Sequence, residues 1–170
     1  KSSQLKIIHR SDILAFLVNN QPSIAVSGSH GKTTTSTVIA SILGGAKKDP
    51  TAIIGGYIPL YKTNGYAGKG KFLVAEADES DGSLIKLSPN IGLITNLELD
   101  HTNYYRNTGE LVKVMKKFGN NCHNLILNYD CELLRSKFKE PAAWWSINNI
   151  KNVEFSAIPK TATGEKTIAD

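Results

Sequence analysis

The sequence predicts an α/β fold, in which a mostly parallel, doubly wound sheet carries helices on both faces. Short apolar runs alternate with segments of helical periodicity along most of the chain, as in proteins built from repeated strand–helix units. The apolar runs are nearly continuous, as expected for strands buried on both faces of a parallel sheet. A glycine-rich turn also stands between the first apolar run and the helical segment that follows it.

The individual elements follow from these patterns in chain order. Gly119 is expected to close the third helix, because glycine readily adopts the backbone conformation of a helix C-terminus. After Pro141 the pattern changes to two short β-like segments, 142–147 and 152–158, with polar residues and no helix between them. They predict a small antiparallel extension near the C-terminus. Helices are expected at 11–19, 33–43, 109–118 and 131–138, and strands at 23–27, 51–54, 71–75, 91–96 and 124–128.

Length and composition favour one globular domain. The chain has 170 residues, 41% of them hydrophobic, and no apolar run near the roughly 18 residues of a membrane span. The first residues lack the apolar stretch of a signal peptide, so we expect a cytoplasmic protein without membrane contact. Cys122 and Cys131 form no CxxC pattern and predict neither a zinc site nor a disulfide. The net charge of +5 comes mainly from scattered lysines, which indicate a solvated surface rather than nucleic-acid binding.

The glycine-rich turn at 28–35, GSHGKTTT, predicts a phosphate-binding loop of the P-loop type. Its glycines let the backbone turn its N–H groups toward an anion at the start of the next helix. The lysine would reach the β and γ phosphates of a nucleotide, and the first threonine hydroxyl would ligate magnesium. The loop is a shortened variant, because Val26 stands where the full pattern has glycine; a simple capped helix turn is the alternative. The candidate nucleotide-binding residues are Gly28, Ser29, His30, Gly31, Lys32, Thr33 and Thr34.

Polar clusters follow two other predicted strands, where ligands bind in doubly wound sheets. The segment 76–82, EADESDG, begins with Glu76, the first polar residue after an apolar run and a candidate magnesium ligand. Four carboxylates bunched there repel one another unless cations or protons offset them. The segment 96–101, NLELDH, offers Asn96 and His101. A solvated acidic loop and an ordinary loop histidine are the alternatives.

Together the segments GSHGKTTT, EADESD and TNLELDH resemble the signature of the Mur ligase family. The resemblance runs from about Arg10 to Tyr105, includes the pair Gly55-Gly56, and is greatest to the branch that adds L-alanine to UDP-N-acetylmuramate. It implies ATP-driven amide formation through an acyl phosphate in peptidoglycan precursor synthesis. It further implies ATP and Mg²⁺ as cofactors, UDP-N-acetylmuramate and L-alanine as substrates, and a cytoplasmic location. By motif correspondence the catalytic residues are Lys32, Glu76 and His101, the magnesium ligands are Thr33, Glu76 and His101, and Asn96 helps to orient nucleotide or substrate.

Two positions depart from the family pattern, and a third feature of some family members is not assigned to a residue here. Ser29 replaces the usual threonine and keeps the hydroxyl, whereas Asn103 replaces an aspartate that would support His101. Some sister ligases carry a carbamylated lysine on the following helix, where Lys113 and Lys116 are in range but neither is assigned.

The resemblance covers only the central domain of such an enzyme. Residues 1–170 are expected to form a single ATP-binding domain, without the N-terminal uridine-nucleotide domain and the C-terminal domain that contacts the amino acid. The isolated chain is therefore expected not to ligate.

Other functions remain open at this point. The chain could belong to another Mur ligase or to a folylpolyglutamate synthase, although the motif EADESD favours the alanine-adding branch. It could also be a non-catalytic nucleotide-binding module. A P-loop kinase or GTPase is disfavoured because the sequence has no NKxD-type motif for reading the base.

Overall fold

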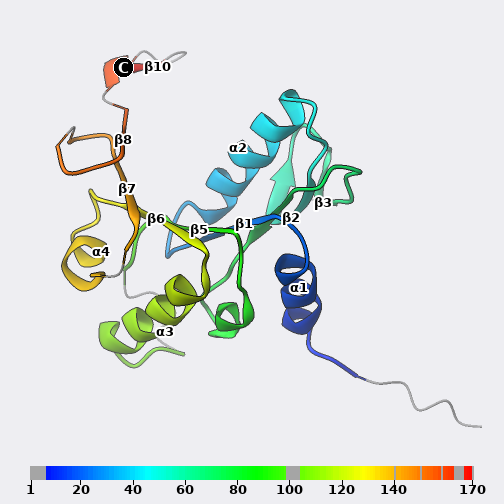
Figure 1. The fold of residues 1–170 in the computed structure, drawn as a ribbon, viewed down its shortest axis with the longest axis horizontal. Helices are drawn as coiled ribbons and strands as arrows, with labels where there is room; N and C mark the ends of the chain where they lie inside the picture. The colour runs from blue at the N-terminus through cyan, green and yellow to red at the C-terminus, as the bar shows by residue number, and fades with distance from the viewer. Residues whose placement is uncertain are drawn as a thin grey trace, which may run out of the picture.

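An eight-stranded, mostly parallel sheet forms the centre of the fold, with strand order β3-β2-β4-β1-β5-β6-β7-β8 (Figure 1). The structure is a computed structural model that describes residues 7–98, 104–139, 141–149, 151–157, 159–162 and 167–169. Its strands are β1 (Ser23–Ser27), β2 (Thr51–Ile58), β3 (Thr63–Tyr66), β4 (Leu73–Glu76), β5 (Ile91–Ile94), β6 (Asn124–Asn128), β7 (Ala143–Ser146) and β8 (Phe155–Ser156).

Helices cover both faces of this sheet, as the sequence predicts. In Figure 1, α2 lies on one side of the strands, and α1, α3 and the 3-10 helix η1 lie on the other. α2 packs on β1, β2 and β4, whereas α1 packs on β1 and β4 from the opposite face. The helices are α1 (Arg10–Asn19), α2 (Lys32–Gly45), η1 (Ser83–Lys86), α3 (Thr108–Asn121) and α4 (Glu132–Lys137).

The sheet separates two hydrophobic cores. On β4, the side chain of Val74 packs into the smaller core with Ala40 of α2, whereas Leu73 and Ala75 pack into the larger core. Successive strand residues point to opposite faces, so a strand buried on both faces needs the continuous apolar run that the sequence shows. The larger core includes Phe118 of α3.

The parallel order places three strand ends together. β1 pairs in parallel with β4 on one side and with β5 on the other. The carboxyl ends of these strands therefore meet at one edge of the sheet, which is where an open α/β sheet binds ligands.

The predicted antiparallel extension was wrong for segments 142–147 and 152–158. β7 pairs in parallel with β6, and β8 pairs in parallel with β7. For β7 the reason is α4, which lies between β6 and β7 and serves as the crossover that returns the chain in the same direction, and β8 continues the parallel order beyond β7. The antiparallel pair near the C-terminus is instead β9 (Pro159–Ala162) with β10 (Thr167–Ala169).

One more antiparallel strand, β3, was not predicted from the sequence. It pairs with β2 at the sheet edge, and its residues, TNGY, are polar or only partly buried. The predicted strand at 51–54 also extends to Ile58 in the structure. The other predicted helices and strands are confirmed, with ends that shift by at most three residues, whereas η1 was not predicted. The prediction that Gly119 closes the third helix was wrong, because α3 continues to Asn121.

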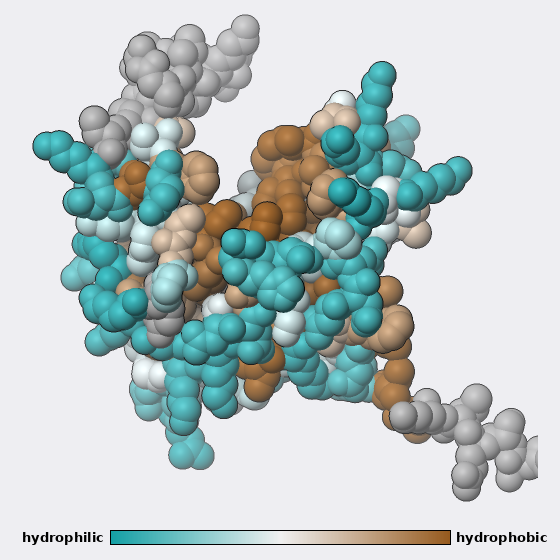
Figure 2. All heavy atoms as spheres, viewed as in Figure 1, coloured by the Kyte–Doolittle hydropathy of each residue, from teal (hydrophilic) through white to brown (hydrophobic). Residues whose placement is uncertain are grey.

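Part of the apolar surface remains exposed on α2. Val38 and Ile42 are 51% and 65% exposed, and apolar atoms gather over this helix in Figure 2. Among the described residues, no helix is long and apolar enough to cross a membrane.

Close packing at Gly92 gives a first prediction. A Cβ atom added at Gly92 would lie 2.1 Å from Cys122 Sγ, so Gly92→Ala should destabilise the domain by about 1–3 kcal/mol through overpacking. Unfolding in urea measures this free energy. Gly65→Ala is the matched control, because a Cβ there meets nothing within 4 Å. The penalty should shrink in a Cys122→Ala background; an equal penalty in both backgrounds would contradict this explanation.

Burial also affects the chemistry of this thiol. Cys122 Sγ donates a hydrogen bond to Phe118 O at 3.2 Å, and burial raises the pKa of the thiol to about 12. Since the thiolate is the reactive form, Cys122 is a packing residue rather than a nucleophile. Cys122 and Cys131 are both free thiols.

Candidate functional site

The predicted phosphate loop connects β1 to α2 at the sheet edge where β1, β4 and β5 end. Gly28 has φ +130° and Gly31 has φ +81°, and both values lie in the region that residues other than glycine rarely adopt. A Cβ at Gly28 would lie 2.2 Å from Thr95 Oγ1 and 2.9 Å from Asn96 O. Gly28 is therefore required both by its conformation and by the close approach of the loop to the end of β5.

Asn96, just beyond β5, holds the first half of the loop in place. Its Oδ1 accepts a hydrogen bond from His30 N at 2.9 Å, and its Nδ2 donates to His30 O at 3.0 Å. Asn96 O accepts from Ser29 N at 3.1 Å, and Thr95 Oγ1 donates to His30 O at 2.6 Å. Both ends of the Asn96 amide thus contact the loop backbone. Asn96 therefore holds the backbone of the loop in place, a role that the sequence pattern did not predict.

These contacts change which backbone groups can face an anion. The sequence predicts that the loop turns its N–H groups toward an anion, but the N–H groups of Ser29 and His30 are bonded to Asn96. Gly31 is the N-cap of α2, and no side chain caps the helix there. The first N–H groups of a helix have no partner within the helix and attract anions. The start of α2 is therefore the anion-facing part of the loop.

Lys32 lies across this loop and is mostly buried. Its Nζ donates to Gly28 O at 2.8 Å and lies 3.0 Å from Glu79 Oε1 and 2.9 Å from Glu79 Oε2. The Lys32 side chain is 11% exposed and the Glu79 side chain only 1%. Segment 76–82 carries four carboxylates, and nothing in its sequence alone marks Glu79 as the buried one.

Thr33 and Glu76 come together on the other side of the loop. Thr33 Oγ1 donates to the Glu76 carboxylate, 3.1 Å from Oε1 and 2.9 Å from Oε2, and Gly55 N donates to Oε2 at 2.8 Å. A Cβ at Gly55 would lie 3.0 Å from Glu76 Oε2, and one at Gly56 would lie 2.5 Å from Thr33 Cγ2. The glycine pair in β2 thus makes room for both side chains. Two adjacent glycines in a strand are the sequence signal for such a close approach.

The Thr33 and Glu76 oxygens suit magnesium. Magnesium prefers oxygen ligands and usually keeps several waters while it binds one or two carboxylates and the phosphates of its substrate. Within the described ranges, no three His, Cys, Asp or Glu side chains form a cluster that could hold a metal by themselves. The donor set therefore fits an ion that is shared with phosphate oxygens. His101, the third predicted ligand, lies outside the described residues, as does Asn103.

Of the three remaining loop residues of the predicted set, Ser29 and His30 contact Glu98, beyond β5. Ser29 Oγ donates to Glu98 O at 2.8 Å and accepts from Glu98 N at 2.9 Å, so the hydroxyl fastens the loop. The exposed His30 ring lies 3.4 Å from the Glu98 carboxylate. Thr34 is exposed on the first turn of α2.

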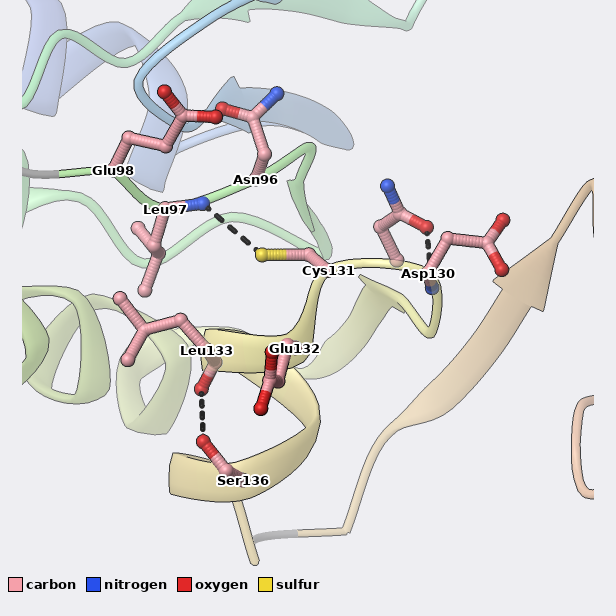
Figure 3. A pocket seen from close by; sticks show the side chains of 9 residues that line it. Asn96, Leu97, Glu98, Asp130, Cys131, Glu132, Leu133 and Ser136 are labelled. Carbon is pink, nitrogen blue, oxygen red and sulfur yellow. Dashed lines mark hydrogen bonds between the residues drawn. The ribbon is translucent and has the colours of Figure 1, made fainter.

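A pocket of about 570 Å³ lies beside the loop, at the ends of β5 and β6 (Figure 3). Glu98, Asp130 and Glu132 line it, and Leu97 N donates to Cys131 Sγ across its wall at 3.4 Å. These carboxylates repel an anion, so the phosphates of a nucleotide are expected at the start of α2 and not in this pocket.

The parallel sheet, the glycine loop and the uncapped start of α2 define the class: an α/β protein with a P-loop-type fold. Within this class the chain belongs to the Mur ligase family. Residues 26–167 match the family described as the Mur ligase middle domain.

Relatives named UDP-N-acetylmuramate--L-alanine ligase match nearly the whole chain. One such protein from Prochlorococcus marinus is 59% identical over 165 residues, which are 97% of this chain and 35% of the relative. The protein from Synechococcus sp. (strain CC9311) is 52% identical over 166 residues, 98% of this chain and 34% of the relative. The chain thus spans about a third of the length of these relatives.

Solved structures of Mur ligases share the fold. The UDP-N-acetylmuramate-alanine ligase from Thermotoga maritima has a TM-score of 0.73 and 27% identity, over 87% of this chain and 33% of that one. The MurF ligase from Thermotoga maritima, solved in complex with ADP, has a TM-score of 0.70 and 20% identity, over 99% of this chain and 44% of that one.

Proposed function

We propose that residues 1–170 are the central ATP-binding domain of a ligase that joins L-alanine to UDP-N-acetylmuramate. The observation that carries this proposal is the meeting of Lys32, Thr33 and Glu76 around the uncapped start of α2. A polyphosphate and a magnesium ion need these groups together. The choice of substrates rests on the names of the relatives that match 97–98% of the chain.

The proposed reaction has two steps, and no protein nucleophile takes part. A carboxylate oxygen of UDP-N-acetylmuramate attacks the γ phosphorus of ATP, and the bond to ADP breaks. The amine of L-alanine then attacks the acyl carbon and gives up a proton, an amide forms, and inorganic phosphate leaves with the oxygen that it received from the carboxylate. Positioning and charge neutralisation supply the catalysis in such transfers.

This chain's residues have separate parts in the first step. The N–H groups at the start of α2 and the Lys32 ammonium would hold the β and γ phosphates. Thr33 and Glu76 would hold Mg²⁺, which supplies a positive charge beside the transferred phosphoryl group. His101 is proposed as a further magnesium ligand or as a ligand through water. Asn96 would act through the loop, since its amide contacts His30 N and O.

The remaining assignments are part of the same proposal. The substrates are a nucleotide sugar, an amino acid and ATP, and neither nucleic acid nor a membrane has a role. We place the protein in the cytoplasm, where free thiols such as those of Cys122 and Cys131 stay reduced.

Removal of the Lys32 ammonium tests the nucleotide site. Lys32→Ala should weaken binding of ATP with Mg²⁺ by on the order of 2 kcal/mol or more, about 30-fold in Kd, because a charge-assisted phosphate contact is lost. Titration calorimetry on the 170-residue chain measures this. Lys48→Ala is the matched control, because Lys48 is an exposed lysine beyond the opposite end of α2. Equal ATP affinity in all three proteins would contradict the assignment.

A chimera tests the reaction itself. The chain would replace the matching third of the Prochlorococcus marinus relative, and formation of UDP-N-acetylmuramoyl-L-alanine would be measured. ATP-dependent product is the expected result. A chimera that binds ATP but forms no amide would instead favour a non-catalytic nucleotide-binding module, and product with another amino acid would favour a sister ligase.

A further inference from the structure

The Lys32 ammonium has its hydrogen-bonding capacity filled by the protein. Nζ donates to Gly28 O at 2.8 Å, to Glu79 Oε1 at 3.0 Å and, more weakly, to Ser29 O at 3.5 Å, and Glu79 Oε2 lies 2.9 Å away in the same ion pair. An ammonium group has three N–H donors. A phosphate oxygen can therefore bind Lys32 only if one of these contacts is given up or shared.

The two kinds of partner differ in charge. Gly28 O and Ser29 O are neutral carbonyls of the loop itself, so their contacts move with the loop. Glu79 brings a full negative charge to the place where the phosphates are expected. Because its side chain is 1% exposed, water screens this charge poorly. Glu79 is thus the partner that competes with a phosphate for Lys32.

Glu79 is also fixed in position by its backbone. The Tyr105 hydroxyl donates to Glu79 O, and Gly82 N donates to the same oxygen at 3.0 Å. Tyr105 is 2% exposed, and burial raises the pKa of its hydroxyl, which therefore remains a donor. The backbone of Glu79 therefore stays beside the loop when a ligand arrives, and only the contact between its carboxylate and the ammonium is given up.

From this geometry we propose that Glu79 is a positioning residue of the phosphate loop: a built-in counter-ion that holds the Lys32 ammonium across the loop and is displaced from it by a polyphosphate. The inference rests on the proposed ATP site and adds how the affinity of that site is set. Part of the attraction between lysine and phosphate is offset by the pair that must be given up. The site would then release ADP more readily than an unopposed lysine allows.

Glu79→Gln tests the proposal, because glutamine keeps the size of the side chain and an acceptor for Lys32 but removes the charge. We expect this variant of the 170-residue chain to bind ATP and ADP about tenfold more tightly, as measured by titration calorimetry in the presence of Mg²⁺. Asp78→Asn is the matched control. It removes the same charge from the preceding residue, whose carboxylate lies 3.8 Å from Lys32 Nζ and is 41% exposed. The affinity for ATP should therefore change less than twofold.

A double-mutant cycle separates this role from a general effect on the fold. If Glu79 acts through Lys32, then Glu79→Gln should have no effect on ATP affinity in a Lys32→Ala background. The empty Glu79→Gln chain should also melt at a lower temperature than the wild type, and saturating ATP should raise its Tm by a larger amount. A role limited to folding would lower Tm without tightening ATP binding.

The outcomes distinguish this inference from the proposed function. If the wild-type chain binds ATP and Glu79→Gln binds it equally or more weakly, the counter-ion role is overturned and the ATP site stands. The same follows if the gain persists without Lys32. If neither protein binds ATP at millimolar concentration, the proposed ATP site itself is contradicted.

Discussion

Replacement of Glu76 by alanine is expected to abolish ligation while the fold is retained. The Glu76 carboxylate meets Thr33 Oγ1 at 2.9 Å, at the place where magnesium and the phosphates are proposed to bind. Without it, the proposed ion loses a protein ligand, and the charge of the transferred phosphoryl group is neutralised less well. We expect turnover in the chimera to fall by about a thousandfold or more, which corresponds to about 4 kcal/mol of transition-state stabilisation.

Stability measurements show whether this loss is catalytic. Glu76→Ala removes hydrogen bonds from Thr33 and Gly55, so the free energy of unfolding should fall by only about 1–2 kcal/mol. Glu132→Ala, which removes a carboxylate at the nearby start of α4, is the control and should keep near-normal turnover. A large drop in thermal stability of Glu76→Ala would show that the carboxylate mainly holds the loop together.

Gly28→Ala should have the largest effect on the architecture of the loop. A methyl group there would lie 2.2 Å from Thr95 Oγ1 and 2.9 Å from Asn96 O, and the backbone has φ +130°. Backbone strain and overpacking each cost about 1–3 kcal/mol, so we expect a loss of about 3 kcal/mol or more in the free energy of unfolding. ATP binding should be lost as well, because the loop must move away from the end of β5.

A second glycine variant separates the two costs. Gly31→Ala has the strained conformation, φ +81°, but its Cβ meets nothing within 4 Å. It should therefore destabilise the chain by only about 1–2 kcal/mol. Denaturant unfolding of both variants gives the comparison, and equal losses would show that the approach to Thr95 is unimportant.

The sequence predicted most of the sheet because burial on two faces leaves a readable pattern. Strands such as β4, with Leu73, Val74 and Ala75 all buried, appear as continuous apolar runs. β3 leaves no such trace, because an edge strand with polar and half-exposed residues has nothing to bury. The direction of β7 was also not readable locally, since the crossover through α4 determines it.

The residues of the candidate site were predictable from the sequence, but several of the contacts between them were not. Lys32, Thr33 and Glu76 stand out because each follows a strand or a glycine turn, and the structure brings them to one edge. The burial of Glu79 was not predictable, because it depends on partners distant in sequence: Lys32, 47 residues away, and Tyr105, 26 residues away. The loop-clamping contacts of Asn96 likewise span 66 residues.

The central position of β1 in the sheet determines when the candidate site can form during folding. The loop after β1 receives Glu76 and Glu79 from the β4 side and Asn96 from the β5 side, so neither half of the sheet contains a complete site. Parallel pairings between distant segments form slowly, because the loops between them must be closed first. A nascent chain that has emerged only as far as β4 would carry the whole glycine loop and Glu76 but would still lack Glu79 and Asn96. The loop proposed to bind phosphate thus takes its final shape late in folding, only after β1 has neighbours on both sides.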